Sequence, residues 1–174
     1  MKKNSISKIK KIKCLIVDVD GVLTDGKIII DHQGRETKEF DVQDGFGLVL
    51  MRRAGFKTAI LSARSASCVT ARAQDLNFDM ICQDARPKIS KYEEILKTFN
   101  LKDNEVCFIG DDLPDLQVLK RVGFSVSVPN GRQEVKKSAD YITKLPGGSG
   151  AVREIVELIL KTQTLWEDIL RNYL

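Results

Sequence analysis

The sequence predicts an α/β fold: a doubly wound, mostly parallel sheet in one domain over residues 1–174. Two observations lead to this prediction. Short apolar runs alternate along the chain with segments of helical spacing, which is the pattern of strand–helix–strand units. The first run, at residues 14–19, is almost continuously apolar, as expected for a parallel strand that is buried on both faces.

The strands follow from the apolar runs and their turn signals. Core strands are expected at residues 14–19, 58–61, 78–82, 106–109 and 124–128, with a short sixth strand at 141–142. Residues 27–30 and 36–40 flank the turn-like segment DHQGR. They predict a β-hairpin flap over residues 27–40 that stands apart from the core strands.

The helices follow from caps and periodicity. One helix is expected from an N-cap at Asp44 to Ala54, and a second from Ser65 or Ser67 to about Leu76. Further helices are expected at residues 89–99, after Pro114, and at residues 151–161. The glycine-rich residues 147–150 read as a flexible joint before the last helix. Residues 165–174 could extend that helix, so residues 147–174 form a C-terminal joint and helix.

The charge pattern argues against a nucleic-acid-binding protein. The net charge is +4, but residues 1–13 hold six lysines and no acid, which leaves 22 basic and 24 acidic residues elsewhere. Residues 1–13 are expected to form a basic arm or a short helix. The rest of the chain is expected to carry no basic surface. No apolar run reaches the ~18 residues of a membrane span, so we expect no membrane contact and a cytoplasmic location. The four widely spaced cysteines are expected to be free thiols.

Polar side chains gather where the predicted core strands end. In parallel sheets the carboxyl ends of the strands share one edge, and ligands bind there. Hard carboxylate oxygens at this edge favour Mg²⁺, while cationic side chains neutralise a phosphate. The residues expected at the edge are Asp18, Asp20, Ser62, Arg64, Lys88, Asp111, Asp112 and Asp115.

Four motifs in order, DVDGVLTDG, a strand ending in Ser62, Lys88 and GDDLPD, resemble those of the haloacid dehalogenase superfamily of phosphotransferases. The resemblance implies that Asp18 is the nucleophile that forms an aspartyl phosphate and that Asp20 is the general acid and base. It also implies Mg²⁺ held by Asp18, the backbone carbonyl of Asp20 and Asp111. Ser62 and Lys88 would bind the transferring phosphoryl group. Asp112 or Asp115 would orient Lys88 or a metal-bound water.

The chain has no room for the cap domain that many members carry. Between Asp20 and Ser62 there are 41 residues, and between Ser62 and Lys88 there are 25. The hairpin with one helix fills the first gap, and one helix with one strand fills the second. A capless enzyme either acts on a large substrate or builds its pocket by oligomerising.

The hairpin, the segment KEFDVQDGFG, the pair Arg64 and Arg72, and the late GGSGAVREI resemble the 3-deoxy-D-manno-octulosonate 8-phosphate phosphatase family. The resemblance implies hydrolysis of this eight-carbon sugar-acid phosphate, which serves lipopolysaccharide inner-core synthesis, and a homotetramer in which a neighbour closes each site. Arg64 and Arg72 lie eight positions apart, about two helical turns, so both are expected on one helix face. The implied substrate contacts are Asp20, Asp41, Val42, Gln43, Asp44, Gly45, Arg64, Arg72 and Lys88.

Two departures from the family pattern leave the substrate open. Val49 stands where some members have a basic residue, and Ser62-Ala63-Arg64 replaces Thr-Gly-Arg. The second change keeps a hydroxyl group, whereas the first leaves room for a nine-carbon sugar-acid phosphate or a related substrate. A receiver-type phospho-switch is a remote alternative. Its phosphoacceptor belongs at the third strand, and it has no counterpart of GDDLPD.

Overall fold

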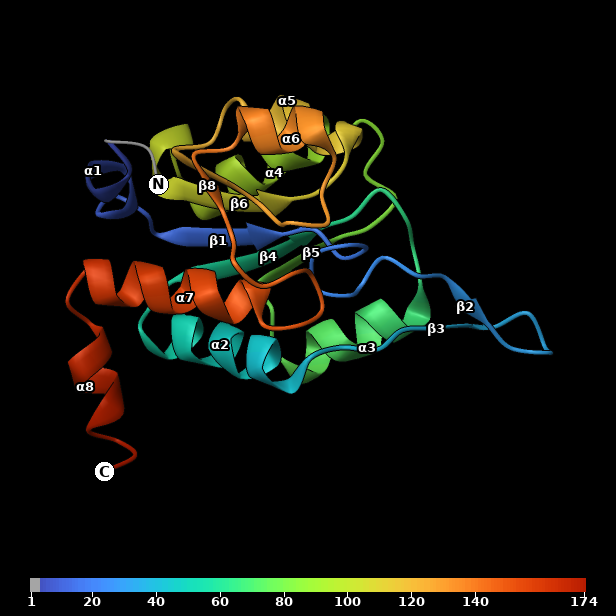
Figure 1. The fold of residues 1–174 in the computed structure, drawn as a ribbon, viewed down its shortest axis with the longest axis horizontal. Coiled ribbons are helices and arrows are strands. Elements are labelled where there is room, and N and C mark those ends of the chain that lie inside the picture. Colours follow the sequence, from blue (N-terminus) through green and yellow to red (C-terminus); the bar gives the residue numbers. More distant parts are fainter. Residues whose placement is uncertain (1–3) are drawn as a thin grey trace.

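The computed structural model describes residues 4–174 and contains one six-stranded sheet in the order β5-β4-β1-β6-β7-β8 (Figure 1). Every neighbouring pair in this sheet is parallel. This confirms the predicted fold class. The strands are β1 (Cys14–Val17), β4 (Lys57–Leu61), β5 (Met80–Cys82), β6 (Val106–Gly110), β7 (Phe124–Ser127) and β8 (Tyr141–Ile142).

Helices cover both faces of the sheet (Figure 1). One face carries α2 (Val42–Arg53), α3 (Ser67–Asp75) and α7 (Ala151–Thr162); the other carries α4 (Lys88–Phe99), α5 (Leu116–Leu119) and α6 (Gln133–Ser138). Strand β1 shows how the sheet divides the core. Leu15 and Val17 pack into the cluster on the α2 and α7 side, whereas Cys14 and Ile16 pack into the cluster on the α4 side. Successive side chains of a strand point to opposite faces, so a continuous apolar run is what this position needs.

The predicted hairpin projects from the body of the molecule (Figure 1). Its strands β2 (Ile29–Ile30) and β3 (Glu36–Thr37) pair antiparallel. The carboxylate of Asp31 accepts hydrogen bonds from the backbone N–H groups of Gln33 and Arg35 and so closes the turn. Three consecutive isoleucines, residues 28–30, are exposed on this projection. An apolar run on a two-stranded ribbon is typical of a surface that another chain covers.

Several helix boundaries differ from the expected ones. Helix α2 begins after an N-cap at Asp41, whose carboxylate accepts from the backbone N–H groups of Gln43 and Asp44, so the expected cap at Asp44 is wrong. Helix α7 ends at Thr162. A separate short helix, α8 (Trp166–Leu170), follows it instead of a simple extension. Short 3-10 turns lie at Asp103–Glu105 and Leu113–Asp115.

The basic N-terminal segment is partly anchored. Its helix α1 (Ser5–Ile9) buries Ile9, and Ile12 is buried after it. Lys8 forms an ion pair with Asp140 at 2.6 Å. Residues 1–3 of the predicted arm lie outside the described residues. The rest is a docked short helix rather than a solvated arm.

The glycine-rich segment at 147–150, expected to be a flexible joint, is packed against the loop that follows β1. A Cβ atom on Gly147 would lie 1.9 Å from the carbonyl oxygen of Gly21, so only glycine fits there. The side chain of Asn130 donates to the Gly21 carbonyl at 2.8 Å and accepts from the Gly147 N–H at 2.9 Å. The N–H of Gly148 donates to the carbonyl of Val22 at 2.9 Å. We call residues 147–150 the glycine strap.

The structure records Cys14, Cys68, Cys82 and Cys107 as free thiols, as expected. Among residues 4–174, no helix has both the length and the apolar character that a bilayer crossing requires. The cytoplasmic location stays a prediction.

Candidate active site

A pocket of about 290 Å³ opens at the carboxyl edge of the sheet, where β1, β4 and β6 end side by side. Parallel neighbours bring their carboxyl ends to one edge, so residues far apart in the sequence meet there. All eight residues expected at this edge line the pocket: Asp18, Asp20, Ser62, Arg64, Lys88, Asp111, Asp112 and Asp115.

Asp18 is the first residue beyond β1 and is held firmly. Its N–H donates to the carbonyl of Ile109 at 3.0 Å, which continues the ladder between β1 and β6. One carboxylate oxygen accepts from the backbone N–H of Val19 at 2.7 Å, and the other lies 2.7 Å from the Nζ of Lys88. Burial raises the pKa of Asp18 to about 7, because the pull of Lys88 only partly offsets the loss of water. Further positive charge near this carboxylate would favour its ionised form.

Lys88 is the buried cation of the pocket. Its Nζ lies between Asp18 and the Oδ1 of Asp115, which is 2.6 Å away. Burial disfavours the charged amine, but these two carboxylates outweigh burial and raise the pKa of Lys88. The other oxygen of Asp115 accepts from the N–H groups of Asp111 and Asp112 at 2.9 and 3.1 Å. Of the two candidates for orienting Lys88, the structure brings Asp115 into contact, whereas Asp112 caps the following turn through the N–H of Leu113.

The pocket fits a hard divalent cation. Asp18, Asp111 and Asp115 each offer an oxygen, and these atoms lie within 4.8 Å of one another. The Oδ1 of Asp111 is buried and has no hydrogen-bond partner among residues 4–174. Burial first, and then the charges of Asp18 and Asp115, raise the pKa of Asp111 to about 8. A buried carboxylate oxygen without a hydrogen-bond partner, in a cluster of acidic groups, is typical of a metal ligand. Asp111 can lie this close to the loop after β1 because residue 21 is a glycine. A Cβ atom at Gly21 would lie 2.1 Å from an oxygen of Asp111.

Ser62 is the first residue after β4; it is buried and lines the pocket. Its N–H donates to the carbonyl of Cys82, and its hydroxyl oxygen accepts from the N–H of Arg64 at 3.2 Å. The hydroxyl hydrogen is therefore free to be donated toward the pocket.

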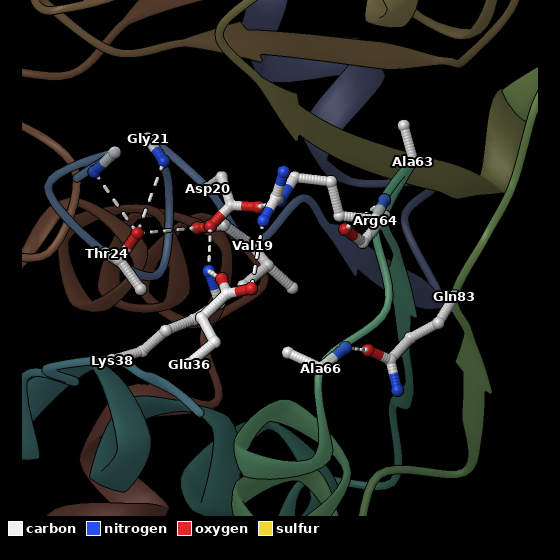
Figure 2. A network of polar contacts seen from close by, with 12 residues as sticks. Val19, Asp20, Gly21, Thr24, Glu36, Lys38, Ala63, Arg64, Ala66 and Gln83 are labelled. Atoms are coloured by element: carbon white, nitrogen blue, oxygen red, sulfur yellow. Dashed lines mark hydrogen bonds and ion pairs between the residues drawn. The ribbon is translucent and has the colours of Figure 1, made fainter. Parts of the chain in front are cut away.

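Asp20, which lines the pocket, faces two cations (Figure 2). One carboxylate oxygen contacts the Nζ of Lys38, and the other lies 3.5 Å from the Nε of Arg64. Glu36 joins the same two cations, with its oxygens 2.6 Å from Lys38 and 2.9 Å from Arg64. Burial disfavours the charged form of Lys38, yet its bonds to Asp20 and Glu36 prevail and raise the pKa of Lys38. The same bond from Lys38 lowers the pKa of Glu36.

Sequence reasoning missed Glu36 and Lys38. The alternation of β-strands offered a signal, because residues two apart on a strand point the same way. The segment from 36 to 40 was predicted only as one arm of a hairpin. Which way that arm faces depends on how the hairpin docks against the sheet edge.

The other predicted substrate contacts lie away from this pocket in the single chain. Asp41 caps α2, and the side chain of Val42 is 75% exposed. Asp41, Gly45 and Arg72 line a second, small cavity. The guanidinium of Arg72 lies where a Cβ on Gly45 would fall and pairs with Asp75 at 2.7 Å. Gln43 lines a separate surface groove beside α7.

The expectation that Arg64 and Arg72 share a helix face is wrong. Helix α3 begins only at Ser67, after an extended Ala66, so Arg64 belongs to the loop after β4. This loop brings Arg64 to the pocket, whereas the helix holds Arg72 against α2.

Asp44 joins two helices that are distant in the sequence. Its side chain accepts from the N–H groups of Gly150 and Arg153 at 3.2 and 2.7 Å and so caps α7 from α2. The residue is 1% exposed, so within one chain its carboxylate is not accessible to a substrate. Burial raises the pKa of Asp44 to about 6, although the two N–H donors favour its charged form.

We expect Asp44 to make stability depend on pH. Its pKa is higher in the folded protein than the usual 3.8, so its contribution is largest below about pH 4 and is lost as the pH rises through about 6. In Asp44→Asn the pH dependence that Asp44 contributes to stability should be lost. The free energy of unfolding of the wild type relative to the variant should fall by on the order of 2 kcal/mol between pH 4 and pH 7. Urea unfolding at several pH values measures this difference. Asp41→Asn, a change at the half-buried cap of α2, is the control. A constant difference for Asp44→Asn would contradict the assignment.

Comparison with known proteins identifies the family of this chain. The haloacid dehalogenase-like hydrolase family model matches residues 61–155. The 3-deoxy-D-manno-octulosonate 8-phosphate phosphatase of Yersinia pestis is 39% identical over 158 residues, which cover 91% of this chain and 84% of that protein.

Solved structures extend the likeness to the whole fold. The 3-deoxy-D-manno-octulosonate 8-phosphate phosphatase of Moraxella catarrhalis, in complex with a magnesium ion, a phosphate ion and KDO, superposes with a TM-score of 0.96. It is 41% identical, and the match covers 99% of this chain and 100% of that one. The cobalt-bound phosphatase from Haemophilus influenzae has a TM-score of 0.87 at 33% identity, over 90% and 92% of the two chains. The chain thus belongs to the 3-deoxy-D-manno-octulosonate 8-phosphate phosphatase family of haloacid dehalogenase-like hydrolases.

Proposed function

We infer that this protein is a Mg²⁺-dependent phosphatase that hydrolyses 3-deoxy-D-manno-octulosonate 8-phosphate to the free sugar acid and inorganic phosphate. The observation that carries this inference is the placement of Asp18. Its carboxylate lies between a buried lysine and a cluster of acidic oxygens that needs a cation, at the floor of an open pocket. The named activity of the relatives supplies the substrate.

The chemistry follows from the roles proposed for the side chains. An oxygen of Asp18 attacks phosphorus and forms a covalent aspartyl phosphate while the bond from phosphorus to the sugar oxygen breaks. Asp20 gives a proton to the departing sugar oxygen. It then takes a proton from the water that hydrolyses the aspartyl phosphate, which frees phosphate and restores Asp18.

The remaining groups stabilise charge on the phosphoryl oxygens. Lys88 supplies a fixed positive charge, and the hydroxyl of Ser62 donates a hydrogen bond. Asp18, the Asp20 carbonyl and Asp111 would hold Mg²⁺, which when bound neutralises charge between the carboxylate and the phosphate. Asp115 keeps Lys88 and the Asp111 backbone in place. Arg64 at the pocket mouth would contact the sugar acid.

Substrate comparison tests this function. We expect kcat/KM for the eight-carbon sugar-acid phosphate to exceed that for p-nitrophenyl phosphate by at least about 10²-fold, since binding energy from the sugar contributes to the rate. EDTA should abolish turnover, and Mg²⁺ should restore it. The nine-carbon 2-keto-3-deoxy-nonulosonate 9-phosphate is the matched competitor, because Val49 leaves that substrate open. Equal rates on the sugar phosphate and the aryl phosphate would refute the assignment, and a preference for nine carbons would reassign the substrate.

A homotetramer is part of the same proposal. Arg72 and the residues at 41–45 do not line the catalytic pocket of their own chain, so contacts to a sugar from these positions require a neighbouring subunit. The exposed isoleucines at 28–30 offer the surface for such packing.

Light scattering should find a tetramer for the wild type. Ile30→Asp places a charge on an isoleucine that is 63% exposed and should dissociate the assembly and lower kcat/KM by at least about 10-fold, because burying an unpaired charge is costly. Ile142→Asp, on the exposed edge strand β8, is the matched control. A wild-type monomer with full activity would exclude a neighbour from the site.

A further inference from the structure

Four charged side chains, Asp20, Glu36, Lys38 and Arg64, form a closed ring (Figure 2). Asp20 and Arg64 also line the pocket. Lys38 contacts Asp20 and lies 2.6 Å from the Oε1 of Glu36. The Oε2 of Glu36 accepts from the Nη2 of Arg64 at 2.9 Å, and the Nε of Arg64 lies 3.5 Å from Asp20. Each carboxylate therefore faces both cations, and the charges of the ring balance.

The ring joins the hairpin to the sheet edge. Asp20 lies in the loop after β1 and Arg64 in the loop after β4, so loops at the sheet edge supply these two members. Glu36 lies on β3 and Lys38 directly after it, so the hairpin supplies the other two. A displacement of the hairpin changes the surroundings of Asp20 and Arg64 together.

Because the ring is partly buried, each of its charges depends on its partners in the ring. The side chain of Lys38 is 1% exposed, so its ammonium group has exchanged water for the two carboxylates. Removing one member of a buried charge pair leaves the partner uncompensated, and the partner then moves or attracts water. Because one oxygen of Asp20 faces Lys38 and the other faces Arg64, the ring fixes the orientation of the carboxylate as well as its position.

We propose that Lys38 and Glu36 are positioning residues through which the hairpin holds Asp20 in the geometry for proton transfer, an inference that rests on the proposed acid and base role of Asp20. A proton passes efficiently only when the two heavy atoms come within about 2.6–3.2 Å. A misplacement of about 1 Å costs on the order of 10²-fold in rate. Two anchors on opposite sides of one carboxylate meet this requirement.

Acid catalysis by Asp20 matters most when the leaving oxygen is basic. Phenyl phosphate and p-nitrophenyl phosphate have nearly the same shape, but the phenolate leaving group needs a proton more than the nitrophenolate does. Their kcat/KM ratio reports the steps up to departure of the alcohol and is independent of contacts to a sugar. A residue that acts only on fold stability or on sugar binding leaves this ratio unchanged.

The first experiment measures both esters with Lys38→Met. We expect kcat/KM for phenyl phosphate to fall by at least about 10-fold and that for p-nitrophenyl phosphate by less than about 3-fold. Lys38→Arg keeps the charge and should recover part of the loss. Lys27→Met makes the same change at an exposed lysine of the hairpin segment and should leave both values unchanged. An equal loss on both esters, or no loss, in a folded Lys38→Met protein would overturn the positioning role.

A second variant covers the case in which Lys38→Met does not fold. Glu36→Gln leaves Lys38 paired with Asp20 and removes the negative charge that bridges Lys38 and Arg64. It should show the same selective loss on phenyl phosphate to a smaller degree. An unchanged ratio in this variant would exclude the ring from proton transfer.

A double-mutant cycle separates this proposal from the function on which it rests. Asp20→Asn alone should lower kcat/KM for phenyl phosphate more than kcat/KM for p-nitrophenyl phosphate. Adding Lys38→Met to it should cost nothing further, because the group that Lys38 positions is gone. A full additional loss would mean that Lys38 acts elsewhere. If Asp20→Asn lowers kcat/KM for both esters equally, the acid role of Asp20 is wrong, and the positioning role of Lys38 is then wrong as well.

Discussion

Replacement of Asp18 by asparagine is expected to abolish phosphate release while the protein stays folded. The amide can still accept from the N–H of Val19, so the local structure has little reason to change. A neutral amide does not attack phosphorus, and kcat should fall by at least about 10⁴-fold because loss of a nucleophile removes the covalent pathway. Steady-state phosphate release measures the loss, and circular dichroism checks the fold.

The neighbouring Asp25 provides the control for this substitution. It lies on the same loop, is half exposed and pairs with Lys27. Asp25→Asn should retain activity within about 2-fold, as surface changes away from reacting groups usually do. Residual turnover of Asp18→Asn above roughly 1% of wild type would reassign the nucleophile, since nucleophile loss costs more than that.

Replacement of Lys88 by methionine should damage both stability and catalysis. Methionine fills a similar volume but leaves Asp18 and Asp115 as buried carboxylates without their shared cation. Breaking such a pair costs about 3–5 kcal/mol of unfolding free energy. Loss of a fixed charge at the phosphoryl group lowers kcat by about 10²–10³-fold. Urea unfolding and phosphate-release assays measure the two effects separately.

The matched control for Lys88 is Lys91, three residues later on α4. Lys91 is 43% exposed and pairs with Glu94 at the surface. Lys91→Met should change the unfolding free energy by less than about 1 kcal/mol and leave kcat unchanged. If Lys88→Met behaves like Lys91→Met, the pair with Asp18 contributes nothing to the site.

The sequence was sufficient for the sheet and for the pocket that its edge creates. A continuous apolar run such as β1 is stable only when both of its faces are buried, so it must be a central strand. Parallel strands then bring their carboxyl ends together at one edge. Asp18, Ser62, Lys88 and Asp111 were therefore found from their places at strand ends, and the structure puts all four around one pocket.

Contacts set by docking could not be predicted in the same way. Asp44 looked like a cap for its own helix, yet it caps a helix whose first bonded N–H is 106 residues away. Lys38 was predicted only as part of a hairpin arm, yet its side chain is buried against Asp20. The pairing of Arg64 with Arg72 failed because the extended Ala66 delays the start of α3. In each case the decisive partner is distant in sequence or depends on a local boundary that periodicity does not define.

The glycine strap has a consequence for the order in which the enzyme is made. Every residue proposed to carry the chemistry lies in the sequence up to Asp115, whereas the strap that packs on the loop after Asp20 begins at Gly147. A nascent chain emerging from the ribosome therefore exposes its nucleophile, lysine and acidic cluster before it has the segment that shapes the loop beside them. The segment that packs on this loop is thus translated after all of these reactive groups. A chain interrupted between Asp115 and Gly147 would carry all of these reactive groups and lack the strap.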